Sequence, residues 1–130
     1  MKYIKKVLLI FSLILIPIPI TIESSKIEFI EREIIIQTGI ASYYANKFID
    51  IETANGELYK HGKLTAAHKS LPFNTIVKVI NINNNKYVFV RINDRLPQNS
   101  KRIIDLSKSA ADSLNMIKKG LVKVNLEIFI

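Results

Sequence analysis

The stretch TIVKVININNNKYVFVRI, residues 75–92, consists of two apolar and β-branched runs joined by three asparagines. In the first run, apolar side chains alternate around Lys78, which is typical of a strand that buries one face. The second run is β-branched and aromatic. Asparagine tolerates the positive φ that a tight turn requires, so residues 83–85 predict the turn of a β-hairpin.

Three further segments predict strands around this hairpin. They are TGIASYY (residues 38–44), RIIDL (residues 102–106) and LVKVNLEIFI, which follows Gly120 and alternates to the C-terminus. Between the last two, Ser107 is expected to cap a helix that runs to about Asn115. Several short strands with one brief helix favour a small closed barrel over a parallel sheet.

The N-terminus has the layout of a secretory signal peptide. Three lysines in the first six residues precede an apolar run over residues 7–20. This run is shorter than the roughly 20 residues that a membrane-spanning helix needs, and Pro17 and Pro19 would break a helix near its end. We therefore predict that residues 1–25 are a signal peptide in transient contact with the membrane, with an uncleaved anchor as the alternative.

The rest of the chain is predicted to form one domain. Residues 26–36 are predicted to be a linker that becomes a strand-like apolar run, although a short amphipathic helix fits the same pattern. Residues 37–130 then form the domain. The sequence contains no cysteine, which excludes a disulfide framework and a thiolate metal site.

The charge of the exported part favours anionic partners. Of the 19 Lys and Arg and 11 Asp and Glu, three lysines and Glu23 lie in the first 25 residues, which leaves 16 against 10 and a net charge of +6. Acidic glycans, nucleic acid and anionic lipid are attracted by such a charge. Export, and the lack of a recognised nucleic-acid-binding motif, exclude nucleic acid as the expected partner.

Polar side chains gather at four places where strands end or loops begin: residues 53–57, 64–73, 92–97 and 102–107. Together with their surroundings they closely resemble the rare lipoprotein A (RlpA) family. The resemblance covers GIASYYANKF, TANGELY, LTAAHKSLPFNTIVKVINI, YVFVRINDRLP and RIIDLSKSAADSLNMIKKG, from about Thr38 to Glu127. It implies a mostly-β fold, a small six-stranded double-psi β-barrel with one short helix, related to the expansin barrel.

The resemblance also implies a function. Characterised members are exported lytic transglycosylases that cleave peptidoglycan between N-acetylmuramic acid and N-acetylglucosamine and leave anhydro-N-acetylmuramic acid ends. They act in the periplasm or cell envelope, and no metal or organic cofactor is implied. The expected partner is the peptidoglycan glycan strand, and the expected state is a monomer.

Cleavage of a glycosidic bond needs an acid that protonates the departing oxygen. In a lytic transglycosylase the primary hydroxyl of the muramic acid is the nucleophile, so one carboxyl that acts as acid and then as base can suffice. By resemblance, the predicted catalytic residues are two acidic positions on which the family depends, a polar position near the cleft and an aspartate of the expansin groove: Asp94, Glu57, His68 and Asp105. The predicted substrate-binding residues are polar side chains in the same motifs: Tyr44, Thr65, Arg95 and Asn93.

Asp94 has a structural alternative, an ion pair with Arg91 or Arg95 at a strand end. A catalytic acid must hold its proton, and adjacent arginines favour the carboxylate instead. Burial, or a neighbouring carboxylate such as Glu57 or Asp105, would have to outweigh them.

The other candidates have alternatives as well. Asp105 could be a capping or turn carboxylate ahead of the helix, and Glu57 a solvated turn residue. His68 could be a buried histidine that is satisfied by a backbone carbonyl. Arg95 could hold the muramic acid carboxylate or screen Asp94. Of the two tyrosines in SYY, alternation along a strand allows at most one to line the groove.

Three positions depart from the family pattern. Lys60 replaces an aspartate, Leu96 replaces a glycine in the loop after Asp94, and Asn74 replaces a glycine that asparagine can mimic. If the family's glycine at this position has a positive φ, a leucine in its place would distort the turn. Because Lys60 removes an acid, a non-catalytic, expansin-like peptidoglycan binder is the alternative function.

Overall fold

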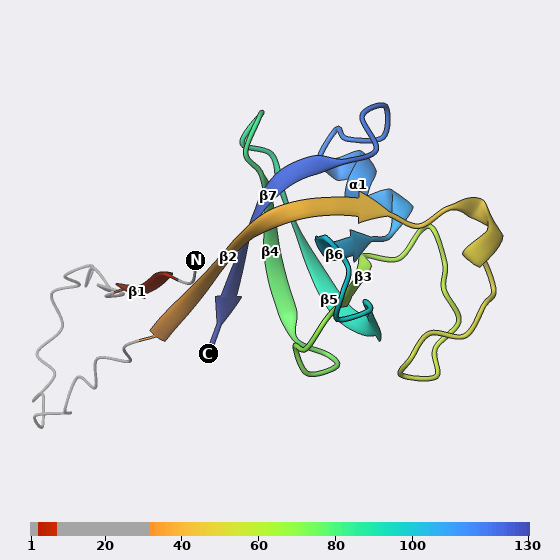
Figure 1. Cartoon of the computed structure of the whole chain (residues 1–130), viewed down its shortest axis with the longest axis horizontal. Helices are drawn as coiled ribbons and strands as arrows, with labels where there is room; N and C mark the ends of the chain where they lie inside the picture. The colour runs from red at the N-terminus through yellow and green to blue at the C-terminus, as the bar shows by residue number, and fades with distance from the viewer. Residues whose placement is uncertain (1–2, 8–31) are drawn as a thin grey trace, which may run out of the picture.

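The computed structural model describes residues 3–7 and 32–130, which form one barrel with a short helix (Figure 1). Its elements, in chain order, are β1 (Tyr3–Val7), β2 (Arg32–Tyr43), the 3₁₀ helix η1 (Asn46–Phe48), β3 (Thr65–His68), β4 (Ile76–Asn81), β5 (Tyr87–Arg95), β6 (Arg102–Leu106), α1 (Lys108–Ser113) and β7 (Val122–Phe129).

The strands follow the order β1-β2-β6-β3-β5-β4-β7, and an additional pairing of β2 with β7 closes six of them into a barrel. The β2–β6 and β3–β5 pairs are parallel, whereas the other pairs are antiparallel. The prediction of a mostly-β, six-stranded barrel with one short helix is confirmed.

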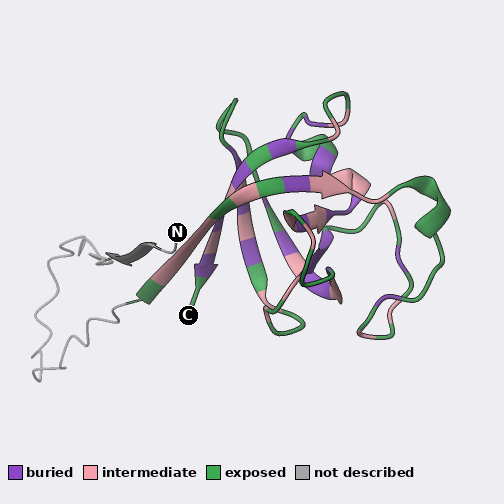
Figure 2. Ribbon diagram, in the orientation of Figure 1, coloured by how far each residue is buried: buried purple, intermediate pink, exposed green. Residues whose placement is uncertain are grey.

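The predicted hairpin is formed by β4 and β5, which pair antiparallel from Ile76 with Arg91 to Ile80 with Tyr87. Asn85 in its turn has φ 60°, the left-handed conformation that asparagine tolerates. Along both strands buried and more exposed residues alternate, as Figure 2 shows. The hairpin therefore contributes one wall of the core.

The core fills the barrel and continues under α1. Its largest members are side chains that are at most 1% exposed: Ile92, Ile104, Leu106, Leu114, Met116, Leu126, Val77, Val79, Val90 and Val124. The helix buries Ala110 and Ala111 against this core. Ser107 caps it as predicted, because its side chain accepts a hydrogen bond from the Ala110 amide.

Two element predictions are refined. Strand β2 begins at Arg32, so the strand-like interpretation of residues 32–36 is confirmed and the alternative of a helix there is wrong. Residues 65–68, which the sequence placed in a loop or strand end, form β3, and all four are buried. A strand that is buried on both faces shows no alternation, so its pattern gave no signal.

The predicted signal peptide lies mostly outside the described residues. Its described part, β1, pairs antiparallel with β2 from Tyr3 opposite Ile36 to Val7 opposite Arg32. No helix in the described part of the chain is long and apolar enough to cross a membrane. The signal peptide and the domain boundaries remain predictions.

A one-residue register shift in β6 depends on Gly39. In the β2–β6 pair, Ile40 lies opposite Arg102 and Ala41 opposite Ile104, so Ile103 is an extra residue. A Cβ atom at Gly39 would lie 2.6 Å from the Cγ2 atom of Ile103. Glycine at this position therefore makes room for the bulge.

We expect Gly39→Ala to lower the free energy of unfolding by about 1–3 kcal/mol, because the added methyl group collides with a packed side chain. Gly62→Ala is the matched control, since a Cβ atom there meets nothing within 4 Å. Urea unfolding of both variants measures the difference. Equal stability of the two variants would show that the bulge does not depend on Gly39.

Candidate active site

A second register shift turns Asp94 out of the core. In the parallel β3–β5 pair, Ala66 lies opposite Ile92 and Ala67 opposite Asp94, so Asn93 is an extra residue on β5. Strict alternation would place Asp94 on the same face as the buried Ile92. The bulge reverses this and directs the carboxylate to the surface of the barrel.

The two shifts align four residues in one row across neighbouring strands. Ala67 pairs with Asp94 on one side and with Asp105 on the other, and Asp105 in turn lies opposite Ser42. Adjacent strands are about 4.8 Å apart, so the Cα atoms of the two aspartates are separated by roughly 10 Å. Ala67, whose side chain is a single methyl group, is the residue between them on the intervening strand.

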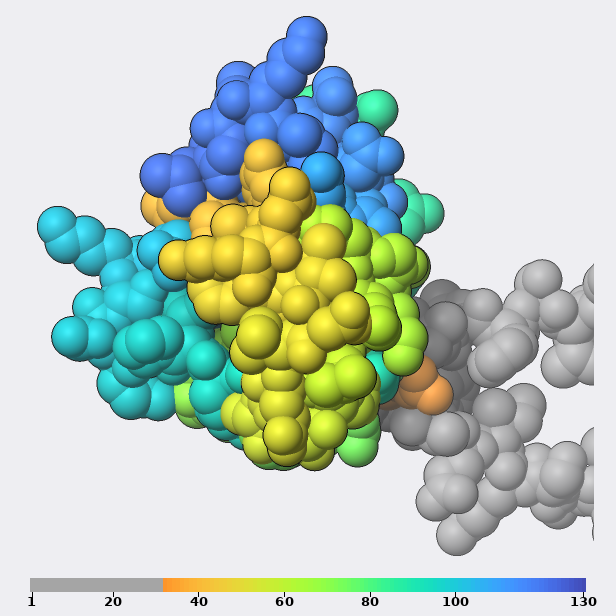
Figure 3. Space-filling view, turned by 90° about the vertical axis from the view of Figure 1, so that its right-hand side faces the viewer, coloured from red at the N-terminus to blue at the C-terminus, as the bar shows by residue number. Residues whose placement is uncertain are grey.

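All four residues of this row line one hollow of about 520 Å³, which we call the groove. The rest of its lining comes from the end of β2, from η1 and from the β5–β6 connection: Tyr43, Tyr44, Ala45, Phe48, Arg95, Leu96, Pro97 and Arg102. In the space-filling view, the segment around η1 (yellow) lies beside the β5–β6 connection (cyan) (Figure 3).

Asp94 is held by three hydrogen bonds rather than by an ion pair. The Tyr44 hydroxyl donates to Oδ2 at 2.5 Å, and the backbone amides of Ala54 and Arg95 donate to Oδ1 at 2.9 and 2.8 Å. No ion pair within the described residues includes Asp94. The alternative of an ion pair with Arg91 or Arg95 is therefore wrong.

Tyr44 is a neutral donor to Asp94. Burial raises the pKa of its hydroxyl far above the ordinary value, and the hydrogen bond to Asp94 raises it further. Its ring stacks on the buried ring of Tyr59 with 4.3 Å between centroids. Tyr43 also lines the groove, so the expectation that at most one of the two tyrosines would do so was wrong. The Tyr43 hydroxyl donates a hydrogen bond to the Ile117 carbonyl at 2.9 Å.

Asp105 lies in the row between Ala67 and Ser42. Arg102 donates to it from Nε at 2.7 Å and from Nη2 at 3.1 Å, and the Ser42 hydroxyl donates as well. Because Ser107 caps α1, the alternative that Asp105 is a capping carboxylate is wrong. Sequence reasoning missed Ser42 and Arg102, since alternation puts residues three apart on opposite faces of a regular strand.

Glu57 lies outside the groove lining and is tied to Arg91. Two guanidinium nitrogens bind its two oxygens at 2.6 and 2.8 Å, and the Asn55 amide donates at 2.7 Å. These bonds, above all those from Arg91, lower the pKa of Glu57 to about 2. The same turn presents the Ala54 amide to Asp94, so the Glu57–Arg91 pair and the Asp94 carboxylate are connected through one turn.

His68 is buried below the groove, with 3% of its surface exposed. Its Nδ1 accepts hydrogen bonds from the amides of Ser70 and Leu71 at 3.1 and 3.0 Å, and Nε2 lies 2.9 Å from Oε1 of Gln37. The alternative of a satisfied buried histidine fits these contacts, although backbone amides take the place of the expected carbonyl.

Two of the four predicted substrate-binding residues line the groove. Tyr44 and Arg95 line the groove, whereas Thr65 and Asn93 are buried and do not line it. The Arg95 guanidinium lies 4.1 Å from the centroid of the Phe73 ring. In the described part of the chain, no three His, Asp or Glu side chains are grouped so as to hold a metal ion.

The three departures from the family pattern have local explanations. Asn74 has φ 69°, a left-handed conformation that asparagine tolerates and glycine adopts freely. Leu96 is not among the residues with positive φ and is 3% exposed, so the leucine is buried here without a left-handed backbone conformation. Lys60 forms an ion pair with Asp50 outside the groove lining.

Comparison with known proteins shows which family this barrel belongs to. A family model described as lytic transglycolase matches residues 36–126. The endolytic peptidoglycan transglycosylase RlpA of Campylobacter jejuni is 56% identical over 90 residues. The chain belongs to the RlpA family of lytic transglycolases. The match covers 69% of the chain and 33% of that relative, so the chain spans about a third of the length of this relative.

Solved structures share the fold at low sequence identity. The Streptomyces papain inhibitor has a TM-score of 0.58 and 21% identity, with 73% of this chain and 94% of that chain covered. The expansin of Clavibacter michiganensis has a TM-score of 0.57 and 16% identity, with 73% and 50% covered. The prediction of an RlpA-like double-psi β-barrel is confirmed.

The contact of Glu57 with Arg91 predicts how the Glu57 carboxyl titrates. Carbon-13 NMR should find the Glu57 carboxyl titrating near pH 2, and Arg91→Gln should raise this value toward the ordinary 4.5, because the principal stabiliser of the carboxylate is lost. Lys60→Gln, which removes an exposed ion pair, is the control and should leave Glu57 unchanged.

The effect on stability follows from the sign of the shift. Because the pKa is lower in the folded chain, the pair stabilises the fold above about pH 4.5, and the contribution is lost as the pH falls through about 2. A Glu57 carboxyl that titrates near 4.5 in the natural chain would contradict the structure.

Proposed function

We propose that this domain is a peptidoglycan lytic transglycosylase, with the glycan strand lying in the groove across Ala67. The observation that supports this most is the row of paired residues that presents Asp94 and Asp105 on one face with a methyl group between them. The names of the RlpA relatives support the same activity. A larger side chain at position 67 would occupy the place proposed for the sugar.

In the proposed reaction Asp94 is first the acid and then the base. Its carboxyl proton passes to the oxygen that joins N-acetylmuramic acid to N-acetylglucosamine as the bond from that oxygen to C1 breaks. The C6 hydroxyl of the muramic acid then bonds to C1 and returns its proton to Asp94. The products are an anhydro-N-acetylmuramic acid end and a free hydroxyl on N-acetylglucosamine, and Asp94 is regenerated.

The surrounding groups are suited to assist this reaction. As a neutral phenol, Tyr44 donates a hydrogen bond to Asp94 and fixes the direction of its carboxyl. Asp105, oriented by Arg102, faces the same groove and offers negative charge to the positive charge that develops on the sugar ring. Arg95 lines the groove and can pair with the lactyl carboxylate of muramic acid.

The proposed substrate also sets the proposed location. A protein that acts on peptidoglycan is exported, so we place this one in the cell envelope, with the periplasm as the compartment and the monomer as the working form. The relatives are named for activity on peptidoglycan, which supports the envelope.

The alternative function, a peptidoglycan binder without catalysis, was suggested by Lys60. Because this residue pairs with Asp50 and does not line the groove, the substitution removes no carboxylate from the proposed reaction centre. The specific reason to favour a binder is thereby weakened, and catalysis is the function that the geometry supports better.

Asp94→Asn should reduce cleavage about 10²- to 10⁴-fold, since the amide cannot donate the carboxyl proton. Mass spectrometry of the soluble products from peptide-free glycan strands measures the anhydro-muramyl ends released by the full chain. Glu33→Gln changes an exposed carboxylate outside the groove and should have no effect. Equal product from Asp94→Asn and the natural chain would exclude Asp94 as the acid.

Lys60→Asp should change the rate of cleavage less than about threefold, because position 60 is exposed and outside the groove. The same product assay compares this variant with the natural chain. Anhydro-muramyl ends from Lys60→Asp alone would instead identify the natural protein as a binder that has lost catalysis.

A further inference from the structure

The stacked rings of Tyr44 and Tyr59 form an aromatic wall whose two hydroxyl groups have different hydrogen-bond partners. On one face the Tyr44 hydroxyl donates to Asp94 in the groove. On the other, the Tyr59 hydroxyl accepts a hydrogen bond from the Lys108 amide at 3.2 Å and lies 2.6 Å from Nδ1 of His61. Since the two rings stack at 4.3 Å, the residues that contact Tyr59 are separated from the groove by this pair of rings.

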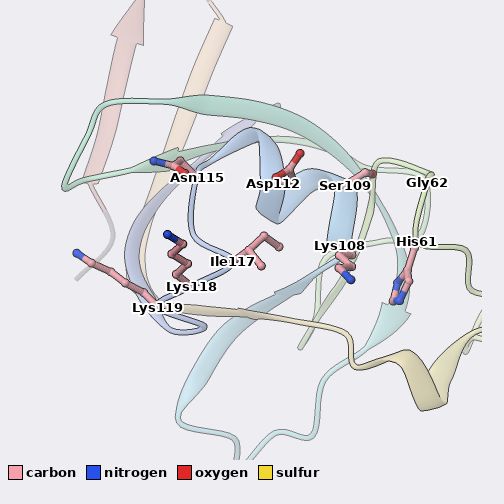
Figure 4. Close-up of a pocket in the computed structure, with 9 residues that line it drawn as sticks. All are labelled: His61, Gly62, Lys108, Ser109, Asp112, Asn115, Ile117, Lys118 and Lys119. Carbon is pink, nitrogen blue, oxygen red and sulfur yellow. The ribbon is translucent and has the colours of Figure 1, made fainter.

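Behind this wall lies a second and larger hollow of about 780 Å³, which we call the basic cleft (Figure 4). Its lining comes from α1, from the loop that follows it and from the turn before β3: His61, Gly62, Lys108, Ser109, Asp112, Asn115, Ile117, Lys118 and Lys119. Figure 4 shows Ile117 in the middle, with His61 and Lys108 toward one end and Lys118 and Lys119 toward the other.

The basic cleft has an excess of positive charge. Three lysines and one aspartate line it, and within the described residues none of these lysines forms an ion pair. Lys118 and Lys119 are exposed on a loop whose position is fixed by the hydrogen bond from Tyr43 to the Ile117 carbonyl. The charges are therefore carried by an anchored loop and are available to an anion.

A chain of shared residues connects the basic cleft to the groove. Tyr43, Tyr44 and Ala45 line both the groove and a hollow of about 550 Å³ beside it. That intermediate hollow shares Lys108 and Ile117 with the basic cleft. In Figure 3 the loop after α1 (blue) borders the same yellow segment that borders the groove.

We propose that the basic cleft is a second binding site, which takes a carboxylate-bearing part of the glycan strand next to the bond that is cleaved. A glycan strand is longer than the groove and bears a carboxylate on each muramic acid, either on the lactyl group itself or on the stem peptide attached to it. Lysine side chains bind such carboxylates as mobile point charges. Ile117 offers an apolar surface to the sugar ring between them.

The inference rests on the proposed glycan substrate, and its test measures binding without cleavage. The full chain with Asp94→Asn is titrated with soluble peptide-free glycan strands, and the dissociation constant is compared after adding Lys118→Gln and Lys119→Gln together. A matched control adds Arg32→Gln and Lys78→Gln, which remove the same charge from residues outside the three hollows.

We expect the cleft variant to bind roughly threefold to tenfold more weakly, which corresponds to two exposed charge contacts. The control should bind as the parent does. Strands whose carboxylates have been converted to methylamides should bind the parent and the cleft variant equally. A cleft variant that binds free-carboxylate strands as tightly as the parent, or a control that weakens binding equally, would overturn the proposal.

A further comparison distinguishes the lactyl group from the stem peptide as the source of the carboxylate. A larger lysine-dependent effect on peptide-free strands assigns the lactyl group, and a larger effect on peptide-bearing strands assigns the stem peptide. Failure of the proposed function is distinguishable, because a chain that binds through the basic cleft but releases no anhydro ends would contradict catalysis alone. In an active chain the cleft variant should raise KM and leave kcat unchanged.

Discussion

The site depends on two one-residue register shifts, one on each side of β3. Without the extra residue on β5, the carboxylate of Asp94 would point into an aliphatic core, where an unpaired charge is strongly unfavourable. The bulge on β6, for which Gly39 makes room, brings Arg102 to the same face as Asp105. The shift on β5 sets the pairing of Ala67 with Asp94, and the shift on β6 sets the pairing of Asp105 with Ser42.

The remaining contacts hold this row in place. The turn that contains Glu57 also bears the Ala54 amide, which donates to Asp94, and Glu57 is bound by Arg91. The stacked pair Tyr44–Tyr59 also supports Asp94, through the hydrogen bond that the Tyr44 hydroxyl donates to it. In a site of this kind much of the polar apparatus positions a few reacting atoms.

Local patterns predicted most of the fold but only part of the site. Alternation identified the β4–β5 hairpin, β6 and β7, and the Ser107 cap located the helix, because each depends on neighbours in sequence. The strand β3 and both bulges depend on partners far along the chain, which alternation does not report. The resemblance to the RlpA family identified Asp94 and Asp105, but not the separation of Thr65, His68 and Asn93 from the groove.

The most direct test of the account is a crystal structure of the Asp94→Asn chain with a peptide-free glycan fragment bound. The account predicts a sugar ring over Ala67, with the glycosidic oxygen within hydrogen-bonding distance of the side chain at position 94 and Asp105 on the far side of the ring. A fragment bound on another face of the barrel, or a side chain at position 94 that points into the core, would contradict it.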